Sequence, residues 1–148
     1  MTIIDSIKSI VENLYANTVD DTDGFFKFFD GENYELNYND NSSWPCVYLV
    51  HPITSTDTES NFGIWQSTFQ FQLAILYKSK LSDKQDDRQP NVDKAYITKL
   101  AIIKSIAALS GFDGWQIAPR SEEIYNAFDV NADGLLTTLS FNMRANQC

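Results

Sequence analysis

Hydrophobic residues near the start of the chain recur at the spacing of an α-helix. Positions three or four residues apart share one side of a helix. Between residues 3 and 15, the apolar side chains that follow this spacing are Ile3, Ile4, Ile7, Ile10, Val11, Leu14 and Tyr15. Mostly polar and charged side chains occupy the positions between them. The pattern predicts an amphipathic helix that lies on a hydrophobic core.

A long segment in the middle of the chain alternates between two kinds of side chain. Its large apolar residues are Trp65, Phe69, Phe71, Leu73, Ile75 and Tyr77, and the residues between them begin with Gln66, Thr68, Gln70 and Gln72. A period of two is typical of a β-strand, so residues 65–77 are expected to form one long strand of about 40 Å with one hydrophobic face. Its uncharged second face can meet either solvent or another subunit. A similar alternation over residues 135–144 predicts a closing strand.

Two shorter strand patterns precede the long one. Aromatic runs flank Asp30 and Gly31 in the stretch FFKFFDGENYELNY, and this dipeptide tolerates the positive φ angles of a tight turn, so a β-hairpin is predicted. Alternation separates the rings into two pairs, Phe26 with Phe28 and Phe25 with Phe29. If one pair faces outward, another subunit is expected to cover it. The run CVYLVHPI predicts a buried strand that Pro52 terminates.

A second helix is predicted after a polar connection. Residues 78–91 are almost wholly polar and end in Pro90, which predicts an exposed loop. From Val92 to Leu109 apolar residues return at helical spacing, and Ser110 and Gly111 supply the stop signal. Three small residues would let this main helix pack closely on a sheet, namely Ala101, Ala107 and Ala108.

Together these elements predict a single α+β domain over residues 1–148, with a mostly antiparallel sheet packed by two helices and with β-hairpins. Hydrophobic residues make up 43% of the chain and aromatic residues 14%, which is too much apolar material for a disordered protein.

The charge balance and the cysteines restrict the class of partner and the compartment. Eleven basic residues against 20 acidic ones give a formal net charge of −9, so the surface would repel a phosphate backbone and charge-driven nucleic-acid binding is disfavoured. No segment approaches the roughly 20 apolar residues of a membrane span, and no secretory signal pattern is present. The two cysteines, Cys46 and Cys148, form no disulfide framework, which indicates a reducing cytosol.

The stretch FDVNADGLLTTLSF invites comparison with a calcium-binding loop. Alternating oxygen donors precede a glycine, at Asp129, Asn131, Asp133 and Gly134. An EF-hand also needs a bidentate acid at position twelve and a helix after it. Position twelve is Ser140, and a strand pattern follows, so NADG is interpreted as the turn of a hairpin. Weak cation binding over Asp129–Gly134 remains the alternative.

No other motif supplies a reactive centre. The single histidine, His51, is interpreted as structural because a metal site needs several converging ligands. Glu122 and Glu123 are adjacent in a strand pattern, so their side chains point to opposite faces and would not share a substrate. No nucleophile, metal-protease, phosphate-loop or dinucleotide motif occurs. We therefore assign no catalytic, cofactor-binding or metal residue, and we expect no cofactor and no enzymatic activity.

The predicted elements follow the order helix, hairpin, strand, long strand, polar loop, long helix and a closing pair of strands. Four stretches define this order: IIDSIKSIVENLY, GIWQSTFQFQLAILYKS, VDKAYITKLAIIKSIAALSGF and DGLLTTLSFNM. In this respect the chain resembles the tail-terminator and head-to-tail joining proteins of tailed bacteriophages, which are small α/β proteins that assemble as a ring on the end of the tail tube. The resemblance includes no invariant motif, so it assigns no functional residue.

The resemblance implies a non-enzymatic virion structural protein that is assembled in the host cytoplasm. Its partners would be further copies of itself, in a ring that is hexameric or matched to a dodecamer, and the neighbouring connector and tail-tube proteins. Genomic DNA would pass through the acidic ring without specific binding, and no membrane would be involved. Loops at residues 52–62 and 78–91 would reach towards neighbours.

Two other classes of function are open. A small cytosolic ligand-binding or accessory interaction domain would have the same α+β pattern, would stay monomeric and would show a pocket among the aromatic residues. An enzyme would require a convergent set of titratable groups, which the sequence does not supply.

Overall fold

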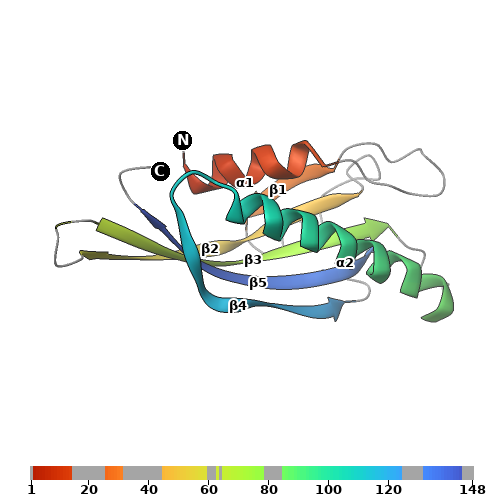
Figure 1. The fold of residues 1–148 in the computed structure, drawn as a ribbon. Helices are drawn as coiled ribbons and strands as arrows, with labels where there is room; N and C mark the ends of the chain where they lie inside the picture. The colour runs from red at the N-terminus through yellow and green to blue at the C-terminus, as the bar shows by residue number, and fades with distance from the viewer. Residues whose placement is uncertain are drawn as a thin grey trace.

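The computed structural model is an α+β fold in which two helices cover one face of a five-stranded sheet (Figure 1). It describes residues 2–14, 26–31, 45–59, 63, 65–78, 85–124 and 132–144. The elements are α1 (Ile3–Glu12), β1 (Lys27–Gly31), β2 (Cys46–Glu59), β3 (Trp65–Lys78), α2 (Gln85–Ala107), β4 (Phe112–Ile124) and β5 (Ala132–Arg144). The strand order is β1-β2-β3-β5-β4, and only β1 and β2 pair in parallel. The predicted fold class is therefore confirmed.

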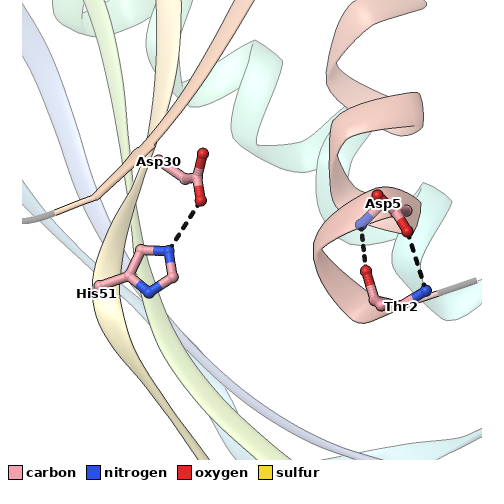
Figure 2. Close-up of polar contacts among 4 residues, drawn as sticks. All are labelled: Thr2, Asp5, Asp30 and His51. Atoms are coloured by element: carbon pink, nitrogen blue, oxygen red, sulfur yellow. Dashed lines mark hydrogen bonds and ion pairs between the residues drawn. The ribbon is translucent and has the colours of Figure 1, made fainter.

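Helix α1 begins at a reciprocal capping box (Figure 2). The backbone amide of Asp5 donates to Thr2 Oγ1 at 3.1 Å, and the Thr2 amide donates to Asp5 Oδ2 at 3.2 Å. Hydrogen bonds from the Thr2 side chain and then from its backbone lower the pKa of Asp5. One turn further, Ile7 and Val11 are fully buried, so the cap fixes where the helix starts and the apolar face fixes how it lies.

We expect the capping carboxylate to make the stability of the protein depend on acid pH. A carboxyl group whose pKa is lowered on folding contributes stability above its unfolded pKa, and that contribution is lost as the pH falls through the folded pKa. Asp5→Ala should therefore unfold at lower urea concentration than wild type at neutral pH. This difference in urea concentration should shrink as the pH falls below 3.8, the ordinary pKa of the carboxyl group. An equal difference at every pH would contradict this role for Asp5.

The main core lies between the sheet and the two helices. Helix α2 contributes Val92, Ala95, Ile102 and Ile106 to it. The sheet contributes alternate residues of its central strands: Phe71, Leu73, Ile75 and Tyr77 from β3, and Leu135, Leu139, Phe141 and Met143 from β5. The period-two prediction for both strands is confirmed, because these residues share one face and are at most 4% exposed.

A second buried cluster lies on the opposite face of the sheet. It consists of Cys46, Tyr48, Val50, Ala74 and Leu76. Burial raises the pKa of the Cys46 thiol, which therefore stays protonated and unreactive.

The predicted hairpin turn at Asp30 and Gly31 is wrong. Both residues lie inside β1, where they pair in parallel with Leu49 and Val50 of β2. The strand therefore continues through the dipeptide, and its parallel partner cannot be reached by a two-residue turn. The second arm of that hairpin lies outside the described residues. Phe26 is buried and Phe28 packs on the same core, as the alternation predicts for that pair, whereas the side chains of the other pair lie outside the description.

Pro52 does not terminate the second strand, which continues to Glu59. The pairing of β2 with β3 shifts between Val50 and Thr54. Pro52 lies inside this irregularity, where a missing N–H group interrupts no regular ladder. Residues 52–59 are therefore strand and not the loop that the sequence predicts.

Helix α2 starts before the predicted position and packs through other residues than predicted. It begins at Gln85, so Pro90 lies within its second turn and removes one helical hydrogen bond close to the N-terminal end. Residues 85–91 are consequently helix and not loop. Ala107 and Ala108 are exposed and Ala101 is half-buried, so the predicted close packing through these three small residues is wrong.

The predicted NADG turn is also wrong where the structure describes it. Asp133 and Gly134 belong to β5, where they pair with Tyr77 and Leu76 of β3. Gly134 also lies opposite Ile124 of β4. A Cβ atom on Gly134 would come within 1.8 Å of the carbonyl oxygen of Ile75. This glycine is therefore required by the close approach of two strands rather than by a turn.

Candidate functional site

The outer half of β2 forms an open edge of the sheet. Strand β1 pairs with β2 only from Cys46 to Val50. Beyond the irregularity, residues 54–59 pair with β3 on one side, and no other described strand pairs with them on the other side. All six residues are exposed. We call residues 54–59 the β2 edge; in Figure 1 they belong to the end of the β2–β3 pair that projects past the helices.

The β2 edge carries different side chains on its two faces. On the side of the sheet away from the helices, its threonines Thr54, Thr56 and Thr58 lie opposite Gln70, Thr68 and Gln66 of β3. On the helix side, Asp57 and Glu59 lie opposite Ser67 and Trp65. Ser67 Oγ donates to Asp57 Oδ1 at 2.6 Å. The Trp65 side chain is 50% exposed, so an aromatic ring and two carboxylates share one accessible face.

The uncharged face of β3 continues across β5 as a network of hydrogen bonds. Thr68 Oγ1 donates to Asn142 Oδ1 at 2.6 Å, and the Asn142 amide donates to Gln116 Oε1 at 3.4 Å. Nearer the centre, the Gln72 amide donates to Thr138 Oγ1 at 3.4 Å. The predicted second face of the long strand is thus mainly a surface of hydroxyl and amide groups, and at its outer end Gln66 donates to Asp113, which also pairs with Arg144.

Helix α2 exposes a hydrophobic surface that includes Tyr96 and Leu100, two residues at the apolar positions of the predicted helix. Ile97 is 72% exposed, Leu100 54% and Tyr96 37%. Lys99 Nζ lies 4.7 Å above the centroid of the Tyr96 ring, and Lys104 is exposed one turn beyond Leu100. We call Tyr96, Ile97 and Leu100 together the α2 face. Contiguous apolar side chains of this kind on a surface are typical of contact sites.

A small pocket lies where α1, β1, β3 and α2 meet. Its volume is about 130 Å³, and its lining residues are Leu14, Phe26, Tyr77, Lys94, Ile97, Thr98 and Ala101. The Tyr77 hydroxyl lies 3.3 Å from Thr98 Oγ1, and Lys94 Nζ lies 5.5 Å from the centroid of the Tyr77 ring. An ammonium group beside apolar walls can accept a small molecule with a negative end.

The acidic and basic residues considered as candidate reactive groups form separate local pairs of an acid with a base. His51 Nε2 lies 3.0 Å from Asp30 Oδ2, and both side chains are partly exposed (Figure 2). Glu122 and Glu123 are successive exposed residues of β4, and Glu122 pairs with Arg120 at 3.5 Å. Within the described ranges, no three histidine, cysteine, aspartate or glutamate residues are grouped so that they could hold a metal ion.

The calcium-loop pattern is only partly described by the structure. Asp129 and Asn131 lie outside the described residues. Asp133 is fully buried and lies within β5, so it is not presented from a loop. Strand β5 also occupies the place of the helix that would leave an EF-hand loop.

Comparison with known proteins adds no family assignment. No protein-family model matches the chain, and no curated protein matches it. Neither described helix is long and apolar enough to cross a membrane.

Proposed function

We propose that this chain is a virion structural subunit of a tailed bacteriophage, a tail terminator or head-to-tail connector that forms a ring between the tail tube and the connector below the portal. The observation that carries this proposal is the β2 edge. No described strand pairs with the outer side of its six residues, so the backbone N–H and C=O groups of the alternate residues that point outward can bond to a neighbour, and soluble proteins usually protect such edges.

The opposite edge of the sheet, strand β4, is protected against pairing with another chain. A neighbour would therefore bind at the β2 edge rather than at β4. Strand β4 pairs with β5 through three register shifts, and it carries Pro119 with exposed Arg120, Glu122 and Glu123. Bulges, proline and charges all prevent edge-to-edge pairing. The β2 edge has threonine or serine at four of its six positions and the carboxylates Asp57 and Glu59 at the other two, so a neighbour with a positively charged surface can approach it more readily.

The surface chemistry is also compatible with a DNA conduit. The formal net charge of −9 repels the phosphate backbone, and the two arginines on this side of the sheet, Arg120 and Arg144, each lie beside a carboxylate, that of Glu122 and that of Asp113. Such a wall lets DNA pass without binding it. In this proposal, the outer face of the sheet is the surface that lines the channel.

We expect the purified protein to form a closed ring, with six copies as the most plausible number. Native mass spectrometry would give its mass directly, once with calcium and once with a chelator. The same ring in both conditions would support the proposal and exclude a calcium-dependent assembly. Open chains of variable length would contradict ring closure.

The pocket supports a second candidate function, a small ligand-binding or accessory interaction domain. Phe26 and Tyr77 contribute aromatic walls, and Lys94 contributes a positive charge. A protein of this class would remain monomeric at every concentration in the same mass spectra. That outcome would favour the pocket over the β2 edge as the functional site.

A further inference from the structure

We infer that copies of this chain associate head to tail, with the helix-side face of the β2 edge of one copy, where Asp57 and Glu59 lie beside Trp65, docked on the α2 face of the next. This inference rests on the proposed function, because it names the two surfaces through which a ring would form. One surface projects from the sheet and the other lies on a helix, so each copy would offer both halves of the contact.

The first argument is that both surfaces expose apolar groups without a described partner in the same chain. Ile97 and Leu100 are more than half exposed on α2, and Trp65 is half exposed beside the β2 edge. Aromatic side chains are enriched at the centres of protein contacts, where they bury a large area with few rotatable bonds. Trp65 is therefore the natural anchor for the α2 face.

The second argument is charge complementarity. The α2 segment from Asp93 to Ala107 carries three lysines, Lys94, Lys99 and Lys104, against one aspartate, in a chain whose formal net charge is −9. The β2 edge carries Asp57 and Glu59 on the face that Trp65 shares. A basic apolar helix and an acidic strand with a tryptophan attract each other, and the strongly acidic remainder of the chain disfavours other orientations.

The geometry of this contact requires a head-to-tail assembly. Two different patches on one subunit form a heterologous contact, which generates a ring if the rotation closes and an open chain if it does not. A two-fold symmetric dimer would instead join identical patches. A head-to-tail contact and a two-fold symmetric contact therefore predict different assemblies when one patch is altered in one chain and the other patch in a second chain.

The test uses one variant of each surface in the full chain. The edge variant carries Asp57→Lys and Glu59→Lys, and the helix variant carries Leu100→Gln. All three residues are exposed, so both variants should keep the wild-type circular dichroism spectrum and urea midpoint. Each variant alone should weaken self-association by about tenfold or more, since the edge variant places like charges across the contact and the helix variant removes an apolar side chain from it.

Mixing the two variants in equal amounts should produce a heterodimer that grows no further. The helix variant retains an intact β2 edge, and the edge variant retains an intact α2 face, so only one productive contact can form between them. Sedimentation velocity and native mass spectrometry would detect this species. A control with Glu122→Lys and Glu123→Lys makes the same charge change on exposed residues of β4 and should assemble like wild type.

The outcomes separate this inference from the proposed function. A wild-type ring that persists in both variants, or variants that stay monomeric after mixing, would overturn the head-to-tail contact and leave the ring proposal standing. Open wild-type chains that both variants abolish and that mixing converts to heterodimers would support the contact and overturn ring closure. A wild-type chain that is monomeric at the highest attainable concentration would overturn both.

Discussion

Gly134→Ala is expected to destabilise the native sheet strongly. The added Cβ would lie 1.8 Å from the Ile75 carbonyl oxygen and 2.9 Å from the Ile75 carbonyl carbon, and these are backbone atoms that cannot rotate away. Strand β5 would have to move from both β3 and β4, because Gly134 lies between Leu76 and Ile124. We expect a loss of about 3–5 kcal/mol, a large part of the roughly 5–15 kcal/mol that stabilises a typical domain.

Urea denaturation followed by circular dichroism would measure this effect. Gly114→Ala is a useful comparison because nothing lies within 4 Å of its added Cβ, although its φ of +99° disfavours a side chain. That variant should lose about 1–2 kcal/mol from backbone strain alone. Thr138→Ala, also in β5, should lower the unfolding free energy by less than Gly114→Ala does. If Gly134→Ala unfolded at the urea concentration of Thr138→Ala, the close strand approach would be wrong.

Phe141→Ala should be nearly as destabilising, because Phe141 is the centre of an aromatic cluster. The side chain is fully buried. Four rings lie around it at centroid distances between 5.7 and 6.2 Å, belonging to Phe69, Phe71, Phe112 and Trp115. Removing the ring leaves a cavity that strands β3 and β4 cannot both close, so we expect a loss of about 3–5 kcal/mol.

The matched control is Ile97→Ala, which removes apolar atoms from a residue that is 72% exposed. Its unfolding free energy should change by less than about 0.5 kcal/mol. Chemical denaturation of both variants at one pH would test the contrast. Comparable losses at the two positions would mean that Ile97 is covered in solution and that Phe141 is not the packing centre.

Periodicity predicted the elements of this fold well wherever a single pattern ran for many residues. The alternation in β3 is long enough that it can be recognised although the polar Ser67 stands at one of its apolar positions. In the structure, the start of α1 depends on Thr2 and Asp5 as well as on its apolar face. Dipeptide signals were less reliable. Asp30–Gly31 and Asp133–Gly134 both have turn composition, yet both lie in strands. At Gly134 the reason is a close backbone approach, which selects glycine as strongly as a turn does.

The two candidate surfaces, the α2 face and the β2 edge, were harder to predict from the sequence than the elements of the fold. Tyr96 and Leu100 follow the helical spacing of core residues, so their exposure depends on which side of α2 meets the sheet, and that is decided by tertiary packing. The β2 edge was hidden because Pro52 usually ends a strand. The uncharged face of β3 was the exception, since Gln66, Thr68 and Gln70 mark it directly.

The position of β5 in the sheet has a consequence for synthesis of the protein. Strand β5 pairs with β3 on one side and β4 on the other, yet it follows both of them along the chain. The segment through Arg144 must therefore be synthesised before β3 can pair on its second side. Until then the edge of β3 that β5 covers has no strand partner, and an unpaired strand edge in a folding intermediate promotes aggregation.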